Sequence, residues 1–153
     1  MILGDGYRDV DQQQLIDNSN WFLNTFWSET PYGEYRSYFN VKLVHVISVD
    51  NGADNGTYGA DRDTALGAYY NCNGIDRLLC VNGGAVYTVA NSHVPEWDVI
   101  FVIVNDPKYG GAGGSYAVFS IHAQAGEVAL HEFGHTFAGL ADEYETAYPG
   151  YPQ

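Results

Sequence analysis

The 153-residue sequence contains 19 acidic and 6 basic residues, which give it a formal net charge of −13. A charge of this sign repels a phosphate backbone, so the composition argues against a nucleic-acid partner. With 46% hydrophobic and 15% aromatic residues, the chain is suited to a single domain with a substantial core. Its longest apolar run, Val99 to Val104, is too short to cross the roughly 30 Å hydrocarbon layer of a membrane. We therefore expect no membrane span, and the first residues carry no export signal.

The first third of the chain predicts a strand, a helix and a second strand. Ile2 and Leu3 indicate a short strand that ends in a glycine turn. Asp11 is a suitable N-cap for the helix, and Gln14 would complete a capping box with it. The apolar stripe of this helix consists of Leu15, Ser19, Phe22 and Phe26. Alternation and β-branched residues over Phe39 to Val49 predict the second strand.

The middle of the chain holds a polar loop and the two cysteines. Asp50 to Asp63 is rich in Gly, Asn and Asp and offers carboxylates for calcium, yet its spacing does not match an EF-hand, so an ordinary solvated or substrate-facing loop is favoured. Cys72 and Cys80 are spaced either for one short-loop disulfide in an oxidising compartment or for two buried free thiols.

The second half predicts two helices and two strands. A helix around Ala85 to Ala90, a strand over Trp97 to Val104 and a strand over Tyr116 to Ser120 precede a helix over Ala125 to Gly139. The glycine-rich segment YGGAGGS at 109–115 is interpreted as a bare turn or a mobile lid. This order of elements favours an α/β fold with a mostly parallel sheet.

The last predicted helix carries the chemistry. Leu130, Phe133 and Phe137, with Ala129 and Leu140, form its expected core face. His131 and His135 lie one turn apart on the other side, where one cation can bind both imidazoles, and Glu132 lies beside them. Zn²⁺ suits such a pair, and a neighbouring carboxylate can act as a general base toward a metal-activated water. The H-E-x-x-H pattern therefore predicts one catalytic zinc ion with Glu132 as the acid/base.

The third protein ligand is not where the extended zinc-peptidase signature would put it. That signature requires a glycine three residues after the second histidine and a ligand six residues after it. Here Ala138 and Ala141 occupy those positions, whereas a shift of one residue gives Gly139 and Asp142. Asp142 is the favoured ligand, and Glu143 or a group outside this chain are the alternatives.

Several stretches together resemble the bacterial IgA-cleaving metallopeptidases, a family of secreted zinc endopeptidases. They are ILGDGY at 2–7, EYRSYFNV at 34–41, GAD at 52–54, TALGAYYNC at 64–72, DRLLCVN at 76–82, VNDPKYGGAGGS at 104–115 and HEFGHTFAGLADEY at 131–144. The resemblance implies His131, His135 and Asp142 as zinc ligands, Glu132 as the catalytic residue, and a secreted or cell-surface location.

The same resemblance implies a zincin fold of the metzincin type. In such folds an antiparallel edge strand precedes the active-site helix and holds an extended peptide by backbone pairing. Tyr116 to Ser120 matches that position, which makes Tyr116 and Val118 candidate substrate-binding residues. Residues 1–153 then form one catalytic domain truncated after the zinc-binding helix, without the lower subdomain.

Other functions fit parts of the sequence. The main alternatives are a non-catalytic extracellular binding module with a structural zinc site and an inactive peptidase fragment. A small-molecule zinc hydrolase is a third, although it would require a closed pocket. Tyr116 and Tyr144 are candidates for a hydrogen bond to the oxyanion, and His122 is the remaining histidine expected nearest the cleft.

Overall fold

The computed structural model describes residues 1–55, 59 and 61–142. Its helices and strands are β1 (Ile2–Asp5), α1 (Gln12–Ser28), β2 (Leu43–Val44), α2 (Gly83–His93), β3 (Phe101–Val104), β4 (Gly111–Ala112), β5 (Ala117–Ser120) and α3 (Ala125–Ala138). The strands form one sheet in the order β2-β1-β3-β5-β4, in which every neighbouring pair is parallel except β4 and β5. The prediction of an α/β fold with a mostly parallel sheet is confirmed.

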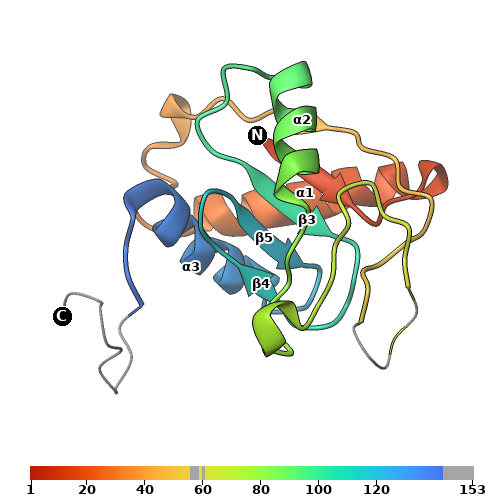
Figure 1. Ribbon diagram of the computed structural model, residues 1–153. Coiled ribbons are helices and arrows are strands. Elements are labelled where there is room, and N and C mark those ends of the chain that lie inside the picture. The colour runs from red at the N-terminus through yellow and green to blue at the C-terminus, as the bar shows by residue number, and fades with distance from the viewer. Residues whose placement is uncertain (56–58, 60, 143–153) are drawn as a thin grey trace.

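The two faces of the sheet are covered by different helices (Figure 1). Along β1, Ile2 belongs to the core shared with α1 and α3, whereas Leu3 belongs to the core shared with α2. Ile103 and Val102 of β3 divide in the same way because successive strand residues point to opposite faces. The chain therefore packs two hydrophobic clusters against one sheet.

Helix α1 buries the stripe that the sequence predicts: Leu15, Ser19, Phe22 and Phe26. Asp11 occupies the N-cap position as predicted, but its side chain makes no capping bond to the helix. Instead its carboxylate accepts hydrogen bonds from the Arg8 side chain, with Nε at 2.7 Å. The predicted capping box of Asp11 and Gln14 is therefore wrong. Helix α2 is confirmed and is longer than expected, with Asn82 Oδ1 accepting from the Ala85 amide as its N-cap.

Two predicted strands are shorter in the structure. The strand expected over 39–49 is reduced to Leu43–Val44, because it lies at the edge of the sheet and pairs only with β1. Ile47 and Val49, which were predicted to belong to this strand, lie outside it and are 57% and 71% exposed. The strand expected over 97–104 begins only at Phe101.

The antiparallel edge strand is not the one expected. Tyr116 to Ser120 was predicted at the edge, but β5 lies inside the sheet and runs parallel to β3. The edge is β4, which comes from the glycine-rich segment and pairs antiparallel with β5. This correction moves the antiparallel edge strand from β5 to residues that the sequence had indicated only as a turn or lid.

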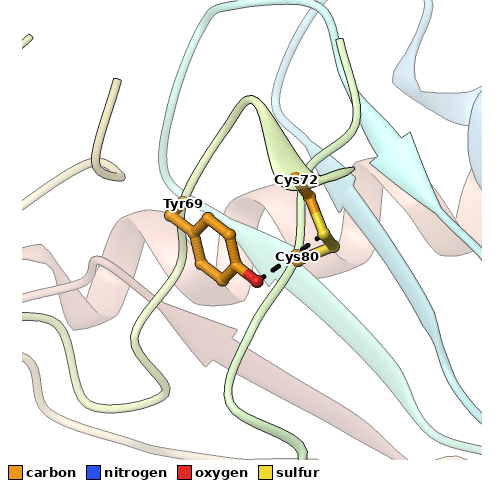
Figure 2. The surroundings of a disulfide bond; sticks show 3 residues. All are labelled: Tyr69, Cys72 and Cys80. Atoms are coloured by element: carbon orange, nitrogen blue, oxygen red, sulfur yellow. Dashed lines mark hydrogen bonds between the residues drawn. A yellow bond between two sulfur atoms is a disulfide. The ribbon is translucent and has the colours of Figure 1, made fainter. Parts of the chain in front are cut away.

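Cys72 and Cys80 form a disulfide, which selects the first of the two alternatives that their spacing allows. Figure 2 shows the Tyr69 side chain beside it, with the hydroxyl 3.6 Å from Cys72 Sγ. The loop that it closes contains Leu78 and Leu79, whose backbone lies against Gly111 of β4. The disulfide therefore stabilises the loop that borders the edge strand.

In the polar loop, where an ordinary loop was favoured over a calcium site, two of the acids accept hydrogen bonds from backbone amides. Asp50 accepts from the Asp63 amide at 2.9 Å, and Asp54 accepts from the Arg62 amide. Residues 56–58 and 60 of this loop lie outside the described residues. None of the helices in the described part of the chain has the length and hydrophobicity that a membrane span requires.

Candidate metal centre

Helix α3 carries His131, Glu132 and His135 and packs on β4, β5 and α1. Ala129 and Phe133 are buried on its core face as predicted. Phe137 and Leu140, which were expected on the same face, are 61% and 62% exposed. Their assignment to the core is wrong because they lie at and beyond the end of the helix, where the packed elements no longer cover it.

The chain reverses at Gly139, directly after α3. Gly139 adopts the left-handed conformation with φ of 64°, and the Leu140 amide donates to the Gly134 carbonyl at 3.2 Å. Such a left-handed cap favours glycine because it has no Cβ to clash. The reversal brings the Asp142 carboxylate back over the histidines of the helix.

Three side chains converge after this reversal. Asp142 Oδ1 lies 2.9 Å from His131 Nε2 and 3.2 Å from His135 Nε2, and the two Nε2 atoms are 3.1 Å apart. Donors around a tetrahedral zinc ion with bonds of about 2.0 to 2.1 Å are separated by about 3.3 Å. Two imidazole nitrogens and one carboxylate oxygen are also a donor set that zinc accepts. The residues present therefore fit such an ion.

Glu132 is the other carboxylate near the histidines. One oxygen of its carboxylate and one nitrogen of each imidazole all lie within 4.8 Å of one another. Glu143, the alternative third ligand predicted from the sequence, lies outside the described residues.

The orientation of His135 is fixed by the segment after the helix. Its Nδ1 lies 2.6 Å from the Leu140 carbonyl oxygen. Because a carbonyl oxygen can only accept, Nδ1 carries a proton, and in the neutral imidazole Nε2 then keeps its lone pair. That lone pair is on the atom that faces His131 and Asp142. A backbone partner of this kind is the usual means of orienting a metal-binding histidine.

Glu132 differs from the two histidines because it is buried, with only 8% of its surface exposed. Burial raises the pKa of its carboxyl group, and the two neighbouring imidazoles oppose that shift. A buried carboxyl with a raised pKa beside a possible metal site is a candidate for proton transfer.

The edge of the sheet borders Glu132 directly, through glycines of the segment 109–115, which the sequence indicated only as a turn or lid. A Cβ built on Gly113 would lie 2.3 Å from Glu132 Oε2 and 3.2 Å from His135 Cδ2. A Cβ on Gly111 would lie 2.4 Å from Val128 Cγ1 of α3. The glycines of YGGAGGS thus allow β4 and the residue after it to approach α3 closely. The high number of glycines in this short segment was the sequence feature that could have indicated such a close approach.

A cavity of about 400 Å³ lies on the other side of the histidines. Its lining residues are Tyr32, Leu130, His131, Gly134, His135, Leu140, Ala141 and Asp142. Tyr32 follows α1, far away in sequence, and no motif indicated it.

The predicted substrate-binding residues lie elsewhere. Val118 is 1% exposed in the core that β5 shares with α2, and Tyr116 packs against Tyr87 of α2. Neither residue lines the cavity at the histidines. His122 contacts the Tyr109 ring edge-on at 5.4 Å and is not among the converging residues. Tyr144 lies outside the described residues.

The features above define an α/β protein with a candidate metal centre at the end of its last helix. A family model described as IgA Peptidase M64 matches residues 1–153. The chain therefore belongs to this peptidase family, which confirms the resemblance drawn from the sequence. A comparison with curated proteins finds no match. Membership of the family points to a metallopeptidase, and the His131, Glu132 and His135 group fits a metal cofactor.

Proposed function

We propose that this protein is a zinc-dependent endopeptidase, in which His131, His135 and Asp142 hold the ion and Glu132 is the general acid/base. The observation that carries the proposal is the convergence of three donor atoms within 3.2 Å of one another beside a buried carboxylate. A purely structural zinc site has no need of that carboxylate.

The chemistry divides between the ion and the protein. A zinc ion held by His131, His135 and Asp142 would lower the pKa of a bound water to about 7 and would polarise a carbonyl group. Glu132 then accepts a proton as the water oxygen attacks the peptide carbonyl carbon, and it returns that proton to the nitrogen of the leaving amine. The peptide C–N bond breaks, and the products are a carboxylic acid, which then releases its proton to solvent, and an amine. Glu132 must act first as a base and then as an acid. The raised pKa supports this double role, because it makes the carboxylate a better base than an ordinary glutamate and still lets the carboxyl group give the proton back.

We further propose that a peptide substrate binds in extended form along β4. The Gly111 amide and carbonyl point away from β5, toward Arg77 and Leu79. These Gly111 groups are already hydrogen-bonded, whereas Gly113 follows β4 directly, and an extended continuation of the strand would turn its backbone groups to the same outer side. No backbone hydrogen bond found among the described residues uses Gly113, which is exposed. The groups available to pair with a substrate are therefore next to Glu132.

The disulfide supports action outside the cytoplasm, in a secreted or cell-surface protein. Thiol alkylation of the protein as isolated from its native cells should leave Cys72 and Cys80 unmodified.

Glu132→Gln provides the direct test. The amide retains the size of the side chain but cannot accept the proton, so cleavage of casein and of immunoglobulin A should be lost. Zinc content, measured by mass spectrometry, should remain near one ion per chain. Glu127→Gln is the matched control, since Glu127 is an exposed acid in the first turn of the same helix and should be dispensable.

Two outcomes would contradict the proposal. Full hydrolysis by Glu132→Gln would exclude Glu132 as the acid/base. A zinc-loaded wild-type protein that cleaves neither substrate nor a peptide library would favour a binding module with a structural site.

A further inference from the structure

Tyr32 lies opposite Glu132 across the candidate zinc ligands. At 100° per residue around α3, Glu132 is about 100° to one side of His131, whereas Leu130 and Gly134 are about 100° and 60° to the other side. Glu132 faces Gly113 at the sheet edge. Tyr32 lines the cavity on the side of Leu130 and Gly134. A peptide carbonyl held between the two sides would meet Glu132 on one and Tyr32 on the other.

Aromatic neighbours fix the Tyr32 ring. It stacks on Phe26 with the ring centroids 4.6 Å apart and an interplanar angle of 24°. It also meets Phe133 edge-on at 5.4 Å. Because Phe26 and Phe133 are buried, these contacts anchor the ring to the core that joins α1 and α3. A side chain held this firmly is already ordered before a substrate arrives.

The Tyr32 hydroxyl has no hydrogen bond to any other residue of the described part of the chain. The hydroxyls of Tyr7 and Tyr70, by contrast, accept from Asn18 and donate to the Lys108 carbonyl. The Tyr32 hydroxyl is open to solvent, and a phenol can donate one hydrogen bond, so it is free to donate that bond to a bound ligand. The cavity that Tyr32 shares with His131, His135 and Asp142 is where a substrate would supply that partner.

We propose that the Tyr32 hydroxyl donates a hydrogen bond to the carbonyl oxygen of the scissile peptide as that oxygen gains negative charge. This inference rests on the proposed peptidase function and assigns it a further catalytic residue. The tyrosines considered from the sequence are less suitable. The Tyr116 hydroxyl lies 3.1 Å from a Cβ built on Gly83 of α2, on the other face of the sheet. Tyr144 is outside the described residues.

Tyr32→Phe tests the assignment, because it removes only the hydroxyl and keeps the ring contacts with Phe26 and Phe133. We expect kcat to fall about a hundredfold or more, as for the loss of one oxyanion donor, with KM within about threefold of wild type. Zinc content and the melting temperature should not change. Tyr35→Phe is the matched control, because Tyr35 is in the same loop but is 54% exposed and should be dispensable.

A binding measurement makes the test independent of turnover. A phosphinic peptide mimics the tetrahedral transition state, so its affinity for zinc-loaded Tyr32→Phe, measured by calorimetry, should fall by a factor similar to that in kcat. Unchanged kcat and unchanged affinity for the phosphinic peptide would overturn the inference, as would a change confined to KM.

Glu132→Gln, assayed in parallel, separates the two proposals. If Glu132→Gln is inactive and Tyr32→Phe is fully active, only the role of Tyr32 is wrong. If Glu132→Gln remains active, the proposed function itself fails.

Discussion

Gly113, directly after β4, lies next to the Glu132 carboxylate. Its replacement by alanine gives the sharpest test of this close approach. The added Cβ would lie 2.3 Å from Glu132 Oε2, whereas real Cβ atoms essentially never approach a heavy atom closer than 3.0 Å. The oxygen must therefore retreat by about 0.7 Å, and by about 1 Å to reach ordinary contact. Oε2 is the end of a flexible side chain, so this movement should cost no more than about 1 kcal/mol of folding stability.

The catalytic effect of Gly113→Ala should be much larger than its effect on stability. A misplacement of about 1 Å at the reacting centre costs about a hundredfold in rate, which corresponds to about 2.7 kcal/mol in the barrier. We expect kcat/KM toward a fluorogenic peptide to fall by that factor, with zinc content unchanged and the melting temperature nearly so.

The control for this variant is Ser115→Ala, an exposed change in the same segment that should retain full activity. Activity of Gly113→Ala within twofold of wild type would refute the argument from the contact. A loss of activity accompanied by an equal loss of zinc or of folded protein would refute it too, because the damage would then not be specific to Glu132.

Three further changes have defined outcomes. Replacing Cys72 and Cys80 with serine should lower the free energy of unfolding by about 2.6 kcal/mol in urea titrations, since their separation of 8 residues closes a short loop; an unchanged midpoint would contradict this. Asp142→Ala should weaken zinc affinity at least about a hundredfold in chelator competition, and unchanged affinity would remove Asp142 from the ligand set. Burial raises the pKa of Asp5 above its ordinary 3.8, so the folded protein retains a proton that the unfolded chain releases. Relative to Asp5→Asn, wild-type stability should therefore fall as the pH rises from about 4 through the folded pKa, and a rise over that interval would refute the shift.

The helices were predictable because their signals are local. Leu15, Ser19, Phe22 and Phe26 recur at helical spacing, and all four are buried. The positions of His131, Glu132 and His135 on one helix follow from the same geometry, as does the glycine cap at Gly139. The expectation that Asp142 approaches both histidines needed only this helix and one turn.

The sheet could not be predicted to the same extent, because pairing depends on residues far apart in the chain. Tyr116 to Ser120 has the composition of a strand, but nothing in it distinguishes an edge from an interior position. The edge strand β4 contains only Gly111 and Ala112, so it has almost no side chains to produce a strand pattern. The strand expected over 39–49 was overestimated for the related reason that β-branched residues favour extended backbone but do not supply a partner.

The sequence by itself determined the candidate metal site of this protein: two imidazoles and a carboxylate within one helical turn, followed by a turn that returns an aspartate to them. These relations are fixed by the helical repeat and by the short chain between His135 and Asp142. The tertiary structure decided what surrounds them. Gly113 reaches Glu132 from the sheet edge, and Tyr32 reaches the opposite side from the end of α1. Both contacts join segments far apart in the chain, and they exist only because the sheet and the aromatic core pack those segments around α3.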